Sequence, residues 1–266
     1  MIEMSGLPDL SDDYVNADYI PGGADYPARW AAEAAAFREG LGARFTRHAY
    51  GPGAREWFDL ALPEGAAEGV LIFVHGGYWK AFDPTLWSHL AAGPLARGWA
   101  VALPCYDLCP DVRISQITAQ VARAVTEIAG AVPGPVVLAG HSAGGHLVAR
   151  MLCPDVVLPV RGRVVRVVSI SPLADLRPLL QTGMNATLRL DAPEARAESP
   201  VFCPQPQVPV TVWVGAAERP VFVAQARALA AAWNAGLVVA AERHHFDVIA
   251  EMASPQSKLV TVMLAD

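Results

Sequence analysis

One twelve-residue stretch, VVLAGHSAGGHL at residues 136–147, constrains this chain more than any other. Residues 136–139 form an apolar run typical of a buried strand, and helical spacing of apolar residues begins at Leu147. Between them, GHSAG fits the Gly-x-Ser-x-Gly pattern of a strand-to-helix turn that lifts a serine hydroxyl above a parallel sheet. The pattern predicts Ser142 as a nucleophile, with the amide of Ala143 facing the negative charge that develops beside it.

Apolar runs with strand character alternate with segments of helical spacing along the whole chain. The expected strands cover residues 56–62, 69–74, 99–103, 136–139, 164–170, 210–214 and 237–240. The expected helices cover residues 31–40, 86–95, 114–128, 173–180 and 220–233, followed by one near Pro255. Alternation of this kind predicts an α/β fold, with a mostly parallel, doubly wound sheet that carries helices on both faces.

We expect a single domain over residues 1–266, because an apolar fraction of 53% suits a sheet covered on both faces. Residues 1–45 hold aromatic side chains among Pro and Gly, and we expect this segment to wrap over the core and overhang the site. Residues 171–208 show no strand pattern. Since this stretch is too long for a bare loop, it is expected to form a small cap.

Charge and hydropathy exclude several classes of partner. The formal net charge of −6 argues against nucleic acid, and no apolar run approaches the roughly 20 residues of a membrane helix. The first residues include an acidic side chain and no apolar segment of the kind that a secretory signal contains. We therefore expect a cytoplasmic protein. A small-molecule substrate is the partner that the motifs imply, and the sequence leaves a homodimer open.

The four cysteines, Cys105, Cys109, Cys153 and Cys203, form no Cys-x-x-Cys pair and show no histidine spacing suited to zinc. We therefore expect four buried free thiols and no metal site.

A nucleophilic serine needs a histidine base and an acid that orients it, in the chain order serine, acid, histidine. Of the seven histidines, only His244 and His245 follow the later strands. His245 is favoured because its neighbours Phe246 and Val248 can anchor the loop in the core, and His244 remains the alternative.

The acid is expected at the carboxyl end of a strand, where functional groups of parallel sheets gather. Glu218 follows the strand 210–214 at this position. Asp175 follows the strand 164–170 and is the alternative, although it can equally cap a helix.

The loop His75-Gly76-Gly77 follows an expected strand and predicts an oxyanion hole built from the amide of Gly76 or Gly77 together with that of Ala143. Tyr78 and Trp79 come next, where a third glycine stands in esterase loops. With Tyr106 they are expected to line the substrate pocket and to favour a small acyl group with an aromatic leaving group. The alternative is that the rings of Tyr78 and Trp79 are packing residues.

Taken together, HGGYW at 75–79 and GHSAGGHL at 140–147 resemble the arylformamidase (kynurenine formamidase) branch of the α/β-hydrolases. ERPVF at 218–222 and HFD at 245–247 resemble the acidic and histidine segments of that branch, with Glu218 where the animal enzymes have Asp. The resemblance implies an α/β-hydrolase fold and a triad of Ser142, Glu218 and His245. It also implies hydrolysis of a formyl-type aryl amide or ester without a metal or organic cofactor.

Two other hypotheses remain open at this stage. A carboxylesterase of broad specificity on short-chain esters would use the same residues. A non-catalytic binding protein that keeps the hydrolase pocket is the other, although such relatives commonly lose a member of the triad and none is missing here.

Overall fold

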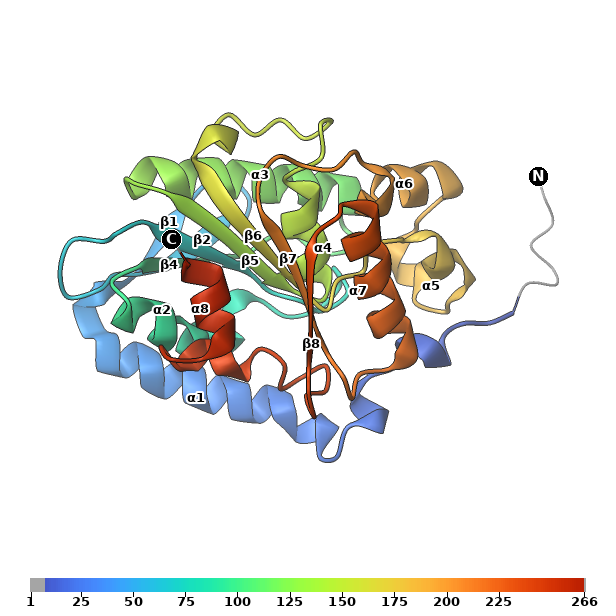
Figure 1. The fold of residues 1–266 in the computed structure, drawn as a ribbon, viewed down its shortest axis with the longest axis horizontal. Helices are drawn as coiled ribbons and strands as arrows, with labels where there is room; N and C mark the ends of the chain where they lie inside the picture. Colours follow the sequence, from blue (N-terminus) through green and yellow to red (C-terminus); the bar gives the residue numbers. More distant parts are fainter. Residues whose placement is uncertain (1–7, 266) are drawn as a thin grey trace.

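A twisted eight-stranded sheet forms the centre of the protein, in the order β1-β2-β4-β3-β5-β6-β7-β8 (Figure 1). The computed structural model describes residues 8–265, so the residues 1–7 on which the signal-sequence expectation partly depends lie outside it. Strands β3 to β8 run parallel, whereas β2 pairs antiparallel with both β1 and β4. The strands are β1 Phe45–Ala49, β2 Trp57–Ala61, β3 Val70–Val74, β4 Ala100–Pro104, β5 Val136–His141, β6 Val164–Ile170, β7 Val210–Gly215 and β8 Gly236–Ala240.

Helices cover both faces of this sheet, which confirms the predicted doubly wound α/β architecture (Figure 1). They are α1 Tyr26–Leu41, α2 Ala92–Ala96, α3 Ile114–Ala131, α4 Ala143–Arg150, α5 Asn185–Leu188, α6 Ala192–Ala197, α7 Pro220–Ala232 and α8 Lys258–Leu264. Successive side chains of a strand point to opposite faces. Ile72 of β3 accordingly packs with α3, α4 and α7, and its neighbour Leu71 packs with α1 and α8.

Three local predictions differ from the structure. The helix expected over residues 86–95 consists of 3-10 turns at Pro84–Leu86 and Ser88–Ala91, followed by the short α2. Strand β1 was not expected, because its sequence FTRHA is mostly exposed and forms a strand only by pairing with β2 at the sheet edge. The helix expected over residues 173–180 is a 3-10 turn at Arg177–Gln181. Residues 171–208 contain no strand, as predicted, and carry the short helices α5 and α6 (Figure 1).

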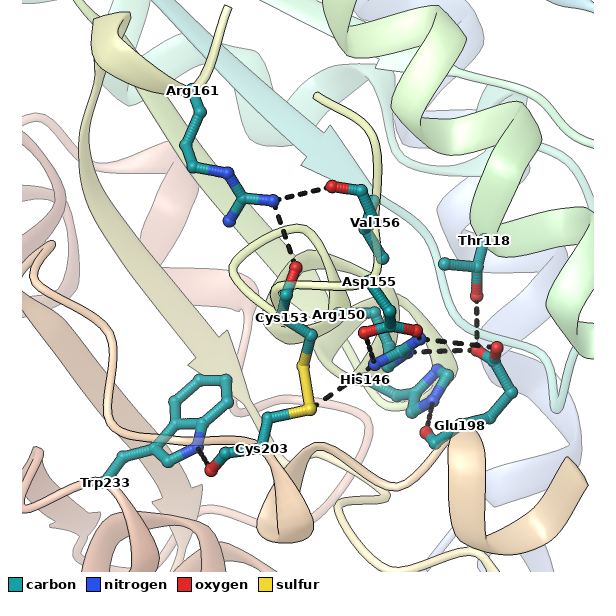
Figure 2. Close-up of a disulfide and its surroundings, with 10 residues drawn as sticks. All are labelled: Thr118, His146, Arg150, Cys153, Asp155, Val156, Arg161, Glu198, Cys203 and Trp233. Atoms are coloured by element: carbon teal, nitrogen blue, oxygen red, sulfur yellow. Dashed lines mark hydrogen bonds and ion pairs between the residues drawn. A yellow bond between two sulfur atoms is a disulfide. The ribbon is translucent and has the colours of Figure 1, made fainter. Parts of the chain in front are cut away.

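The prediction of four free thiols is wrong for two of them, because Cys153 and Cys203 form a disulfide (Figure 2). Cys153 follows α4, and Cys203 lies near the end of the 171–208 segment. The two sulfur atoms meet only because the fold brings these distant segments together, so sequence spacing could not show the pairing. Cys105 and Cys109 are free and buried, as predicted.

A buried ionic network lies beside this disulfide and joins the same two segments (Figure 2). Arg150 of α4 is 1% exposed, and its Nε donates to Glu198 Oε2 at 3.1 Å. His146, also on α4, contacts the backbone oxygen of Glu198 through Nε2 at 2.6 Å. The disulfide and these contacts hold α4 against the 171–208 segment.

Replacing both disulfide cysteines, Cys153→Ser with Cys203→Ser, should lower the free energy of unfolding by about 4 kcal/mol, because the bridge closes a loop with a sequence separation of 50. Denaturant titration under non-reducing conditions measures this difference. Wild-type protein with the bridge reduced is the control and should match the double variant. Equal stability of the oxidised wild type and the double variant would contradict the expectation.

Candidate active site

Ser142 lies at the sharp turn between β5 and α4, with φ 57° and ψ −119°. A positive φ is uncommon for a residue other than glycine and persists only where surrounding contacts enforce it. The turn is tight enough that a Cβ at Gly140 would overlap the backbone oxygen of Gly144. A Cβ at Gly144 would likewise overlap the oxygen of Val74 on β3. Both glycines of the motif are therefore required by close backbone approach.

Glu218 and His245 form a buried pair, although 27 residues separate them in the sequence. His245 Nδ1 lies 2.6 Å from Glu218 Oε2, and the two side chains are 4% and 0% exposed. The other carboxylate oxygen accepts hydrogen bonds from the amide of Gly215 at 2.7 Å and from Ser171 Oγ at 2.5 Å. With both oxygens engaged, the carboxylate is held in one orientation, and the proton on Nδ1 leaves Nε2 of His245 as an acceptor.

The alternatives considered for these positions lie in other contacts. Asp175 Oδ2 accepts from Arg177 Nη2 at 2.7 Å, and its Oδ1 accepts from the amide of Arg177. His244 contacts the hydroxyl of Tyr26 through Nε2 at 3.1 Å and accepts backbone amides of its own loop at Nδ1. Neither residue takes part in the Glu218–His245 pair.

The glycine loop after β3 lies directly against the serine turn. A Cβ at Gly76 would lie only 3.0 Å from Ser142 Cβ, and Gly77 has φ 112°. His75 supports the loop, because its Nδ1 lies 2.7 Å from the oxygen of Gly76 and its ring stacks on Tyr106 at 4.3 Å. Burial lowers the pKa of His75 to about 4, so this ring is neutral at physiological pH.

A second neutral histidine, His141, borders the base. Its ring centroid is 4.6 Å from that of His245. Burial, and secondarily the nearby His245, hold the pKa of His141 well below its ordinary value. His141 therefore brings no positive charge next to His245.

One cavity of about 310 Å³ contains both Ser142 and His245. Its walls are mainly apolar and aromatic, and the titratable side chains that line it within the described part of the chain are tyrosines and histidines. The lining residues are Tyr14, Val15, Asn16, Ala17, Gly23, Pro27, Trp30, Gly76, Gly77, Tyr78, Phe82, Trp87, His141, Ser142, His245 and Phe246. Cavities of about 470 and 570 Å³ lie elsewhere on the protein, and neither is lined by Ser142, Glu218 or His245.

The residues predicted for the substrate pocket divide into those that line this cavity and those that do not. Tyr78 lines it, and so does the N-terminal segment, which was expected to overhang the site. Trp79 and Tyr106 do not, and the prediction for these two residues is wrong. Both side chains are fully buried. For Trp79 the reason is the backbone, which turns at Tyr78 and Trp79 with φ 51° and 54°. The ring of Trp79 packs edge-on against that of His146, with 5.0 Å between the ring centroids, and the ring of Tyr106 stacks on that of His75.

The 171–208 segment contributes no side chain to this cavity. Residues 14–30 form a large part of the cavity wall instead. Sequence reasoning missed Asn16, Trp30 and Trp87 as lining residues. For Asn16 and Trp30 the signal was the clustering of aromatic and polar residues among Pro and Gly near the N-terminus, whereas Trp87, which follows the glycine loop, carried no such signal.

Within residues 8–265, one group of side chains lies close enough together to hold a metal ion: Cys153, Asp155 and Cys203. Its two sulfur atoms are already joined in the disulfide. It lies outside the Ser142 cavity. Across the same residues, no helix combines the length and apolar character that crossing a bilayer requires.

Comparison with known proteins decides the family. Residues 71–261 match the model of the alpha/beta hydrolase family. The chain belongs to the alpha/beta hydrolases. Kynurenine formamidase of Drosophila melanogaster is 32% identical over 211 residues, covering 71% of this chain and 69% of the fly protein. That of Danio rerio is 29% identical, covering 81% and 79%. This alpha/beta hydrolase is therefore arylformamidase-like, as the motifs predicted.

Solved structures agree with the fold of this alpha/beta hydrolase. A candidate thioesterase from Silicibacter sp. tm1040 is 56% identical with a TM-score of 0.94, covering 96% of this chain and 98% of that one. An esterase from Pyrobaculum calidifontis has a TM-score of 0.64 at 16% identity and covers 90% of each chain. At that identity the likeness concerns the fold alone.

Proposed function

We propose that this alpha/beta hydrolase is a serine hydrolase that removes a small, formyl-type acyl group from aryl amides or esters. Ser142 is the nucleophile, His245 the base and Glu218 the acid that orients it. The observation that carries the proposal is that Ser142 and His245, the latter paired with the buried Glu218, line one aromatic-walled cavity.

In the proposed reaction, Ser142 Oγ attacks the acyl carbon while His245 Nε2 takes the hydroxyl proton. The carboxylate of Glu218 stabilises the imidazolium through Nδ1–H. His245 then returns the proton to the departing amine or alcohol. Water releases the acyl group by the same route, so the chemistry needs no metal or organic cofactor.

The oxyanion of the tetrahedral intermediate is assigned to backbone donors. Ala143 is the first residue of α4, and Gly76 and Gly77 line the cavity beside Ser142. Amides fixed in a site from which water is excluded stabilise developing negative charge strongly, typically by about 3 kcal/mol for each donor.

The substrate class rests on two supports. The aromatic walls suit an aryl leaving group, and the curated relatives are kynurenine formamidases. The structural relative at 56% identity is described as a candidate thioesterase, so the test must span several leaving groups. A panel of N-formylkynurenine, N-formyl arylamines, short-chain aryl esters and an acyl thioester gives the comparison. Highest kcat/KM on a formamide supports the proposal, whereas highest kcat/KM on simple esters identifies a carboxylesterase. Absence of turnover on the whole panel would favour a binding protein.

The side chain of Tyr78 should limit the length of the acyl group. It adjoins the glycine loop and lines the cavity, so a longer acyl chain meets the ring. On aryl esters, we expect kcat/KM to fall about tenfold at the first methylene that no longer fits. Tyr78→Gly should flatten this series, whereas Tyr78→Phe, which keeps the ring, should preserve it. A wild type that cleaves octanoyl esters fastest would overturn the small-acyl assignment.

A cytoplasmic location remains a prediction. The Cys153–Cys203 disulfide gives it a direct test, since reducing compartments disfavour such bonds. Thiol trapping in freshly lysed cells measures the fraction of each form, and a fully oxidised pool would contradict a cytoplasmic location.

A further inference from the structure

Asn16 carries a buried hydrogen-bond acceptor that no described residue satisfies. The residue is 7% exposed, it lines the Ser142 cavity, and its Oδ1 has no partner. Leaving such an atom unpaired is unfavourable, because it loses its hydrogen bonds to water and gains none in the protein. A buried acceptor without a partner in a binding cavity therefore points to a ligand that donates to it.

The neighbours of Asn16 fix which atom of its amide is left over. The hydroxyl of Tyr78 donates its single proton to the backbone oxygen of Tyr14 at 2.6 Å. The Tyr78 oxygen can therefore only accept from Asn16, and it does so from Nδ2 at 3.4 Å. Turning the amide over would place two acceptors against each other. Oδ1 is consequently the free atom, and it requires a donor.

Two other buried polar atoms of cavity-lining residues also lack partners among the described residues. Both are ring nitrogens, Trp87 Nε1 and His141 Nε2. The indole nitrogen can only donate, and the role of the imidazole nitrogen depends on its tautomer. Of these three atoms, Asn16 Oδ1 is the one that its contacts identify as a hydrogen-bond acceptor.

The cavity also restricts what kind of donor can reach this oxygen. Among residues 8–265 no acidic side chain lines it, so an ammonium group would lose its hydration without gaining a counter-ion. A neutral N–H carries no such penalty. Asn16 also borders a second cavity, of about 190 Å³, together with His245 and Glu218, which places it close to the base. The carboxylate of Glu218 is already engaged by its three donors.

We propose that Asn16 Oδ1 accepts a hydrogen bond from the N–H of the scissile amide, so that Asn16 selects amides over the corresponding esters. The proposal rests on the hydrolase function proposed above. Nucleophilic addition makes the amide nitrogen pyramidal, and its lone pair must face His245 to receive the proton. An acceptor that holds the N–H on the other side stabilises this arrangement, whereas the oxygen of an ester needs no such help.

The test compares formanilide with phenyl formate, which share acyl and aryl groups and differ in the N–H. Asn16→Leu should lower kcat/KM for formanilide on the order of 10- to 100-fold and change that for phenyl formate, corrected for spontaneous hydrolysis, less than about threefold. A merely structural role would lower both rates together, and that result, or no change in either, overturns the proposal.

Matched variants guard against an indirect effect. Asn16→Ala removes the same acceptor without adding bulk, and should give the same selective loss. The turn itself does not depend on the side chain, because the backbone oxygen of Asn16 accepts from the amide of Tyr19. Asp13→Ala, an exposed change on the same segment, should leave both rates unchanged.

A binding measurement separates this proposal from the proposed function. Calorimetry with Ser142→Ala protein needs no turnover, and formanilide should bind about tenfold or more weakly when Asn16→Leu is added. Loss of binding in that background supports the Asn16 contact even if the hydrolase assignment fails. Unchanged binding refutes the contact even if the enzyme hydrolyses the amide.

Discussion

Ser142→Ala is expected to lower kcat on the best substrate of the panel by about 10⁶-fold, which is the scale seen when the nucleophile of a serine hydrolase is removed. The two tyrosine hydroxyls that line the cavity among residues 8–265 cannot substitute for it. Burial raises the pKa of Tyr78 and of Tyr14, so neither side chain forms a nucleophilic phenolate at neutral pH. The fold should survive, because Ala and Ser meet the same steric restriction at φ 57°.

Two measurements accompany this variant. Thermal unfolding should stay close to that of the wild type, which establishes that lost activity is not lost structure. A serine-directed phosphonylating reagent should label the wild type at Ser142 alone, as peptide mass spectrometry can show. A folded Ser142→Ala protein with full activity would end the proposed mechanism.

Glu218→Gln is expected to lower kcat on the order of 10³- to 10⁴-fold. The carboxylate accepts at both oxygens, from His245 Nδ1, Ser171 Oγ and the amide of Gly215. An amide has one acceptor atom and no charge, so it cannot satisfy all three donors or stabilise an imidazolium. The orientation of the base and the stability of its protonated form should be lost together.

Asp175→Asn is the matched control for this prediction. Asp175 is the other acid with the right place in the chain, but its carboxylate contacts Arg177. Steady-state kinetics should show a change within about threefold for this variant. A large loss at Asp175 together with an active Glu218→Gln protein would reassign the acid.

The sheet and the serine turn could be predicted because their signals are local. The apolar run of β5 and the glycines around Ser142 reflect backbone geometry that a short stretch determines by itself. The contact between Glu218 and His245 could also be anticipated, because each follows a strand of a parallel sheet and the ends of those strands meet.

The remaining features depend on contacts between distant segments, which carry no local pattern. Cys153 and Cys203 show no spacing that distinguishes a bridged pair from two buried thiols. Trp79 was placed in the pocket because it adjoins the glycine loop, yet two residues in succession with positive φ direct its ring into the core. Asn16 is one polar residue among many until Tyr78 and Tyr14 fix its orientation.

The cavity wall at residues 14–30 has a consequence for how such an enzyme can diversify. The proposed nucleophile, acid and base all come from the second half of the chain, whereas much of the cavity wall, which the proposed function assigns in part to the leaving group, comes from residues 14–30. The wall is attached by side-chain contacts such as Tyr26 with His244 and Arg219 with Asp12, rather than by strands of the sheet. Exchanging this one contiguous segment between homologues would therefore transplant leaving-group preference as a module, with the reaction machinery left in place.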